Sequence, residues 1–79
     1  MKKMKERVVE ILVKVKSVIT PHLGDNTLVS DGVLDSLDIM NLIMALENEF
    51  DIEIDPEDVL SENFESVDKM VELIQKCQS

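Results

Sequence analysis

Apolar residues recur at steps of three and four along this chain, which is the spacing of amphipathic helices. The first such stretch predicts a helix from Met4 to about Ile19. The last predicts a helix that Ser66 caps and whose apolar face is Val67, Met70, Val71 and Ile74. A chain of 79 residues has room for one hydrophobic core. We therefore expect a single all-α domain over residues 1–79.

A helix start signal lies in the middle of the chain. Asp35 suits the N-cap position, Ser36 falls in the first turn, and Asp38 stands three residues after the cap. There its negative charge favours the positive end of the helix. The spacing predicts a central helix from this point to about Phe50.

Turn-forming residues fill the segments between these expected helices. Pro21 and Gly24 end the first apolar pattern, and a polar loop of about 15 residues leads to the central helix. Pro56 suits the first position of a short helix over Glu57 to about Ser61. The expected fold is a bundle of three main helices plus one short helix.

The charge of the chain is strongly negative and unevenly placed. Asp and Glu number 17 against eight Lys and Arg, for a net charge of -9. Residues 1–16 carry six bases and two acids, whereas residues 17–79 carry two bases and fifteen acids. Such a surface repels nucleic acid. It either attracts proteins with basic surfaces or only keeps a small protein soluble. We therefore expect no nucleic acid as a partner.

Membrane spanning and disulfide bonding are also poorly supported by the sequence. The longest apolar run, Leu42–Leu46, has five residues, far fewer than the roughly 20 that cross a bilayer. A single cysteine, Cys77, cannot form an internal disulfide. That composition fits a reducing compartment, so we expect a cytoplasmic protein with no membrane span.

The expected central helix is apolar over more than one face. Eight of its first eleven residues are apolar, which is wider than a single core-facing stripe. Leu37, Met40 and Met44 share a face by their spacing and are candidates for a partner patch. The alternative is that these side chains belong to the core.

Two segments of the chain resemble the core of the acyl carrier protein family. Asp31–Asp38 reads Asp-Gly-Val-Leu-Asp-Ser-Leu-Asp, and Leu42–Phe50 reads Leu-Ile-Met-Ala-Leu-Glu-Asn-Glu-Phe. The resemblance extends to length, acidity and helix order. It implies that Ser36 carries 4'-phosphopantetheine, transferred from coenzyme A by a separate Mg²⁺-dependent transferase. The terminal thiol would hold an acyl group as a thioester, and the chain itself would not be an enzyme.

The resemblance also implies which residues meet partners and cargo. Phosphopantetheinyl transferase and acyl-transferring or synthase enzymes with basic surfaces would contact Asp35, Leu37, Asp38, Met40, Met44 and Glu47. The acyl chain would be sheltered by Ile43, Leu46, Ile54, Val59 and Phe64. Ordinary core packing is the alternative for the second set. A carrier that visits several enzymes is expected to be a monomer.

The sequence departs from the fatty-acid type of carrier at several positions. Val33 and Leu34 precede Asp35 where that type has a small pair, and Asn41 and Asn48 stand where an acid is usual. The chain could therefore serve fatty-acid synthesis or a dedicated acyl, polyketide or aminoacyl pathway.

Three other functions are compatible with parts of the sequence. An unmodified acidic helical module would share every surface feature with a carrier. A catalytic triad would need Ser36, His22 and an Asp, but such residues occur by chance in most chains. An EF-hand-like spacing is formed by Asp51, Glu53, Asp55, Glu57 and Glu62. Pro56 occupies the position that needs Gly in that loop, so no metal site is expected.

Overall fold

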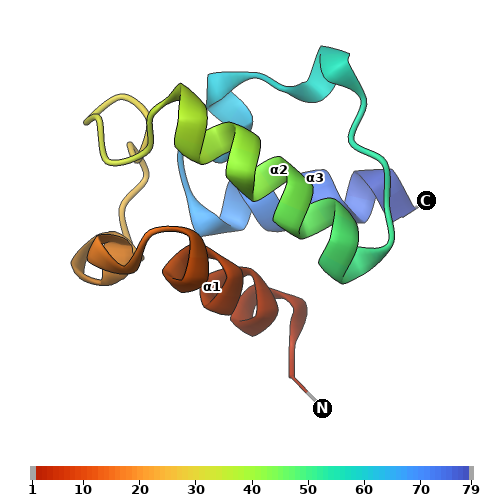
Figure 1. The fold of residues 1–79 in the computed structure, drawn as a ribbon, viewed down its shortest axis with the longest axis horizontal. Coiled ribbons are helices and arrows are strands. Elements are labelled where there is room, and N and C mark those ends of the chain that lie inside the picture. The colour runs from red at the N-terminus through yellow and green to blue at the C-terminus, as the bar shows by residue number, and fades with distance from the viewer. Residues whose placement is uncertain (1, 79) are drawn as a thin grey trace.

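The computed structural model describes residues 2–78 and has an all-α fold (Figure 1). The three α-helices are α1 (Met4–Val15), α2 (Ser36–Phe50) and α3 (Val67–Gln78), and the 3-10 helices are η1 (Ser17–His22), η2 (Pro56–Asp58) and η3 (Ser61–Phe64). The predicted fold class is confirmed, as are the central and last helices. No helix in the described part of the chain is long and apolar enough to cross a membrane.

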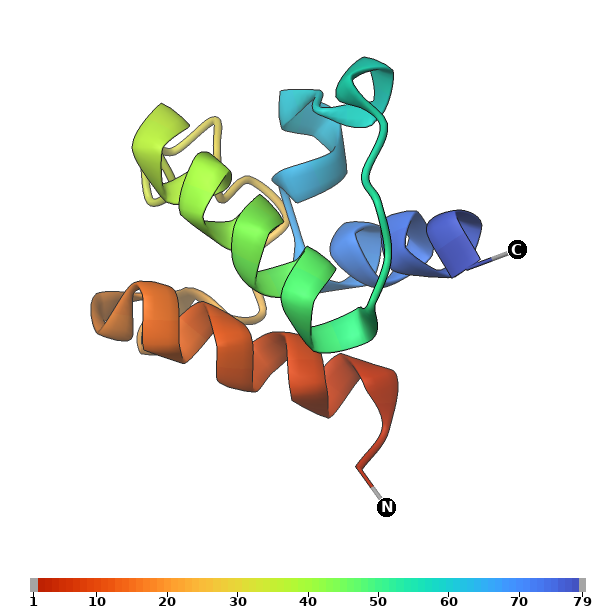
Figure 2. The ribbon, with the colours of Figure 1, turned by 45° about the vertical axis from the view of Figure 1, so that its right-hand side comes forward.

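The core is one cluster to which all three α-helices contribute. Each helix buries residues three or four apart, as an amphipathic helix must, and the long loop and the segment after α2 add further side chains. The buried apolar residues are Val8, Ile11, Leu12, Ile19, Leu28, Leu34, Leu42, Leu46, Phe50, Ile54, Phe64, Val67, Met70, Leu73 and Ile74. Helix α1 packs against both α2 and α3, and Figure 2 shows α1 and α2 side by side.

The first helix ends earlier than the sequence predicts. The expected helix reached Ile19, but α1 ends at Val15 and Lys16 is extended, with φ of -150°. The chain then continues as η1, which contains Pro21. Proline has no backbone N–H and clashes with the carbonyl four residues earlier, so α-helical geometry could not continue through it. The break still leaves Ile19 buried in the core.

The prediction of one short helix after the central helix is also wrong. Instead of one helix over Glu57 to Ser61, the structure has two 3-10 turns, η2 and η3, with Val59 and Leu60 between them. Pro56 does begin η2, and the Asp55 side chain accepts a hydrogen bond from Glu57 N at 3.0 Å. In both views this segment arches from the end of α2 back toward its start (Figures 1 and 2).

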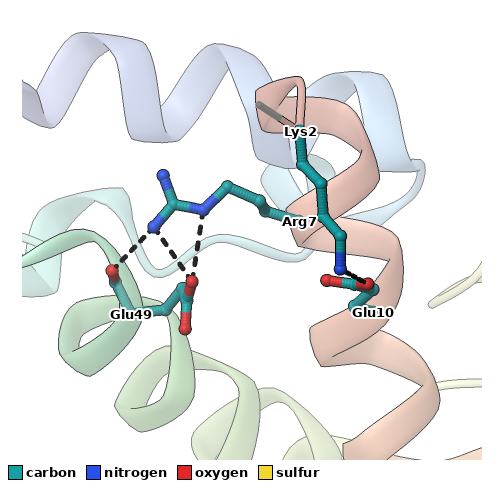
Figure 3. A network of polar contacts seen from close by, with 4 residues as sticks. All are labelled: Lys2, Arg7, Glu10 and Glu49. Carbon is teal, nitrogen blue, oxygen red and sulfur yellow. Dashed lines mark hydrogen bonds and ion pairs between the residues drawn. The ribbon is translucent and has the colours of Figure 1, made fainter.

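An arginine joins α1 to the end of α2. Arg7 Nη2 donates to Glu49 Oε2 at 2.9 Å and to the Glu49 carbonyl oxygen at 3.0 Å, as Figure 3 shows. Its guanidinium also lies over the Phe50 ring, 4.3 Å from the centroid. Lys2, which precedes α1, pairs with Glu10 of that helix. Because Arg7 makes both polar and cation–π contacts, it fixes how α1 meets α2.

Candidate functional site

The start of α2 is built by a reciprocal pair of aspartates. Asp35 is the N-cap, and its Oδ1 accepts a hydrogen bond from Asp38 N at 2.9 Å. Asp38 Oδ2 in turn accepts from Asp35 N at 3.1 Å. This capping box satisfies backbone donors that a helix start leaves free. It fixes Ser36 in the first helical position, with the residue exposed to solvent.

Asp38 also forms an ion pair with the residue that follows α1. Lys16 Nζ lies 2.7 Å from Asp38 Oδ2, and the Asp38 side chain is only 17% exposed. Burial alone would raise the pKa of the Asp38 carboxyl, but the Lys16 hydrogen bond and the hydrogen bonds with Asp35 outweigh it and lower the pKa. Asp38 is therefore held as a carboxylate that ties the end of α1 to the start of α2.

Replacing Asp38 by Asn is expected to lower the free energy of unfolding by about 1–2 kcal/mol at pH 7, because it weakens the cap and removes the Lys16 ion pair. The folded pKa lies below the unfolded one, so this stabilisation is complete above about pH 4 and is lost as the pH falls through the folded pKa. Urea unfolding of both proteins at pH 7 and near pH 3 measures the difference.

Glu53→Gln is the matched control for this prediction. Glu53 is exposed and makes no hydrogen bond or ion pair within residues 2–78, so the variant removes one negative charge without removing a contact. Its stability should stay within about 0.5 kcal/mol of the wild type. Equal losses in Asp38→Asn and Glu53→Gln at pH 7 would contradict the role given to Asp38.

An open hollow of about 570 Å³ lies beside Ser36. Its walls come from the loop before α2, from the first turns of α2, and from the segment that joins η2 to η3. The lining residues are Val29, Gly32, Leu34, Asp35, Ser36, Ile39, Met40, Val59, Leu60 and Ser61. Most of these side chains are apolar, so the hollow offers an apolar surface directly next to the serine hydroxyl.

The structure separates the predicted partner residues into two groups. Leu37, Met40 and Met44 are 65%, 61% and 61% exposed, so the alternative that they are core residues is wrong. The three predicted acids differ in whether their carboxylates bind other parts of the protein. Asp35 is exposed, whereas Asp38 pairs with Lys16, and Glu47 Oε2 accepts a hydrogen bond from Ile54 N at 2.9 Å.

The predicted acyl-chain residues do not gather in the hollow. Only Val59 among them lines it. Leu46, Ile54 and Phe64 are buried in the core, and Ile43 is half-buried against that core. Leu34 and Leu60, which were not among the candidates, line the hollow instead. Leu34 lines the hollow and is buried in the core. The resemblance to the fatty-acid type of carrier predicted a small residue at this position.

His22, which the alternative catalytic triad would need, has another partner in the structure. His22 Nδ1 lies 2.9 Å from Asp25 Oδ2, and no hydrogen bond joins it to Ser36 within residues 2–78. In the described part of the chain, no three His, Cys, Asp or Glu side chains lie close enough together to hold a metal ion.

Comparison with known proteins shows to which family this chain belongs. The family model described as a phosphopantetheine attachment site matches residues 6–74. The acyl carrier protein of Buchnera aphidicola subsp. Acyrthosiphon pisum (strain Tuc7) is 39% identical over 77 residues, covering 96% of this chain and 94% of that protein. This chain belongs to the acyl carrier protein family. The resemblance seen in the sequence is confirmed.

Two further acyl carrier proteins show the same level of similarity. The protein of Buchnera aphidicola subsp. Baizongia pistaciae (strain Bp) is 42% identical over 71 residues, which cover 80% of this chain and 88% of that protein. The protein of Buchnera aphidicola subsp. Schizaphis graminum (strain Sg) is 42% identical over 74 residues, which cover 92% of this chain and 86% of that protein. No solved structure matches the chain.

Acyl carrier proteins are carriers rather than catalysts, and their domain holds a covalently attached 4'-phosphopantetheine. The start of α2 fits this group. The Ser36 hydroxyl has no hydrogen-bond partner within residues 2–78. Backbone N–H groups and the dipole at the start of a 15-residue helix favour a phosphate ester there. The adjoining apolar hollow suits the less polar part of the arm.

Sequence reasoning missed one polar residue of this region, Glu65. Its carboxylate accepts hydrogen bonds from the loop before α2, at Val29 N and Ser30 N, over distances of 2.7 and 2.9 Å. These pairs are separated by 36 and 35 positions in the chain. No local pattern predicts such a contact. Glu65 is one of three acids spaced three residues apart, with Glu62 and Asp68, so its position in the sequence did not distinguish it.

Proposed function

We propose that this acyl carrier protein family member carries acyl groups as thioesters on a 4'-phosphopantetheine arm attached to Ser36. The observation that carries the proposal is the exposed Ser36 hydroxyl, which has no hydrogen-bond partner within residues 2–78 and lies at a capped helix start beside an apolar hollow. The bound group supplies a flexible arm that ends in a thiol. The protein contributes the hydroxyl, the helix start and the surface that partners recognise.

Attachment needs an enzyme because the site itself is acidic. Asp35 and Asp38 stand beside Ser36 and repel an incoming phosphate. Lys16 neutralises only one of them. A transferase that brings Mg²⁺ and basic side chains offsets this repulsion. The Ser36 oxygen then forms a phosphodiester, the pyrophosphate link of coenzyme A breaks, adenosine 3',5'-bisphosphate leaves, and the serine proton passes to the transferase.

Recognition by partner enzymes is assigned to the exposed part of α2. Leu37, Met40 and Met44 form an apolar patch that flexible methionines can fit to several surfaces. Asp35 adds exposed negative charge, and the net charge of -9 speeds encounter with basic surfaces. Asp38 and Glu47 act mainly by holding this helix and its neighbours in place.

The acyl chain is expected to enter through the hollow that Val59 and Leu60 border. Ile43, Leu46, Ile54 and Phe64 lie in or against the core behind the surface. They remain the predicted lining of an interior pocket that forms when a chain is loaded.

The test is the intact mass of the purified protein before and after incubation with coenzyme A, Mg²⁺ and a broad-specificity phosphopantetheinyl transferase. We expect the addition of one phosphopantetheine, and fragmentation of the product should locate it on the peptide that contains Ser36. A folded, unmodified protein that gains no mass would contradict the proposal. It would favour an unmodified acidic interaction module that uses the same α2 surface.

A further inference from the structure

Within residues 2–78, the loop before α2 buries Leu28 and Leu34 in the core, and its hydrogen bonds to other segments all end on a single residue. Glu65 accepts hydrogen bonds from Val29 N and Ser30 N, and its second carboxylate oxygen accepts from the Ser30 hydroxyl. The Glu65 backbone oxygen accepts a further bond from Leu28 N at 2.9 Å. Within residues 2–78, every hydrogen bond that joins residues 27–34 to another segment ends on Glu65.

The remaining hydrogen bonds of this loop are internal. Leu34 N donates to the Leu28 carbonyl oxygen at 2.9 Å, and Asp31 N donates to the Thr27 carbonyl oxygen at 2.8 Å. These bonds shape the loop but do not attach it to the rest of the protein. Gly32 has φ of +77°, a conformation that other residues rarely adopt. The loop is thus a preformed unit that Glu65 fastens by hydrogen bonds, in addition to the packing of Leu28 and Leu34 in the core.

Glu65 connects two walls of the hollow beside Ser36. On one side its carboxylate holds the loop, which contributes Val29, Gly32 and Leu34 to the lining. On the other side Glu65 directly follows η3, which contributes Ser61. The hydroxyl and N–H of Ser30 lower the pKa of the Glu65 carboxyl, so it accepts these bonds as a carboxylate near neutral pH.

We propose that Glu65 is a positioning residue for the modification of Ser36. It fixes the loop that leads into Ser36 relative to η3, and so presents the serine and the adjoining hollow in one arrangement. The inference rests on the proposed function. A transferase that meets a fastened loop does not have to order it, whereas a loosened loop adds an ordering cost to binding.

The test compares Glu65→Gln with the wild type in the transferase reaction, well below the melting temperature of both proteins. We expect kcat/KM for the carrier to fall about tenfold, mostly through a higher KM, because ordering of the loop precedes a productive encounter. Amide hydrogen exchange at Val29 and Ser30 should become faster in the variant. Ser30→Ala, which removes one of the three bonds, should show smaller changes in the same direction.

Glu62→Gln is the matched control. Glu62 is an exposed acid of η3 with no hydrogen bond or ion pair within residues 2–78. The Glu62→Gln variant loses the same charge as Glu65→Gln but keeps the hydrogen bonds of the loop. Its kcat/KM and the amide exchange of Val29 and Ser30 should therefore match the wild type. An equal fall in both variants would overturn the inference, since charge alone would then explain it.

The remaining outcomes separate this inference from the proposed function. If the wild type is modified and Glu65→Gln is modified equally well, the inference is overturned and the proposed function stands. If Glu65→Gln is less stable but keeps its kcat/KM, Glu65 is a structural residue only, which also overturns the inference. A wild type that takes up no phosphopantetheine overturns both.

Discussion

A Ser36→Ala variant is expected to gain no mass when the wild type gains one phosphopantetheine under the same conditions. The change removes only the hydroxyl oxygen to which the phosphate would be attached. That hydroxyl has no hydrogen-bond partner within residues 2–78, and alanine is favourable in a helix. The variant should therefore keep its fold and its circular dichroism spectrum. Intact mass spectrometry gives the result as complete loss of modification.

Ser61→Ala provides the control for that prediction. Ser61 lines the same hollow as Ser36 and is also exposed, so a transferase approaching this face would meet both hydroxyls. Only Ser36 lies at the start of a long helix. We expect Ser61→Ala to be modified like the wild type. Modification of Ser36→Ala at the wild-type rate would place the arm elsewhere and contradict the assignment.

Features set by neighbouring residues could be predicted from the sequence. The cap at Asp35 with its partner Asp38 depends on a spacing of three residues, and the structure has both bonds. Ser66 caps the last helix in the same way, accepting a hydrogen bond from Lys69 N at 3.1 Å. The faces of α1, α2 and α3 follow from helical periodicity. Local geometry decides all of these features.

Contacts between distant segments could not be predicted. Glu65 is joined to the loop, and Arg7 to Glu49, across more than thirty positions. The acids of α2 illustrate the same limit. Asp38 and Glu47 were predicted to contact partners, and that prediction did not include the ion pair with Lys16 or the hydrogen bond from Ile54 N. A carboxylate that recruits a partner and one that fastens the fold are the same residue type in a sequence.

The sequence also could not predict which apolar residues after α2 are buried in the core and which line the hollow. Leu60 and Phe64 are both large apolar residues of the segment after α2. Phe64 is fully buried, whereas Leu60 is 46% exposed and lines the hollow. The two 3-10 turns, η2 and η3, decide which side chain points in which direction. Because 3-10 turns are short and irregular, the spacing of apolar residues does not reveal them.

A Phe64→Ala variant is expected to be largely unfolded at 25 °C. Phe64 is fully buried and is among the largest side chains of the core. Truncating a buried phenylalanine costs about 3–5 kcal/mol, whereas a core of this size supplies only about 3–5 kcal/mol of net stability. The loss is therefore as large as the stability itself. Far-UV circular dichroism and a urea titration should show little helix and no cooperative transition.

Leu60→Ala is the matched control for that prediction, since Leu60 lies four positions earlier in the same segment but is half exposed. Its loss should change stability by about 0.5 kcal/mol or less. Phe64→Leu keeps most of the buried volume and should remain folded at a lower melting temperature. A Phe64→Ala variant that unfolds cooperatively within a few degrees of the wild type would contradict the packing described for η3.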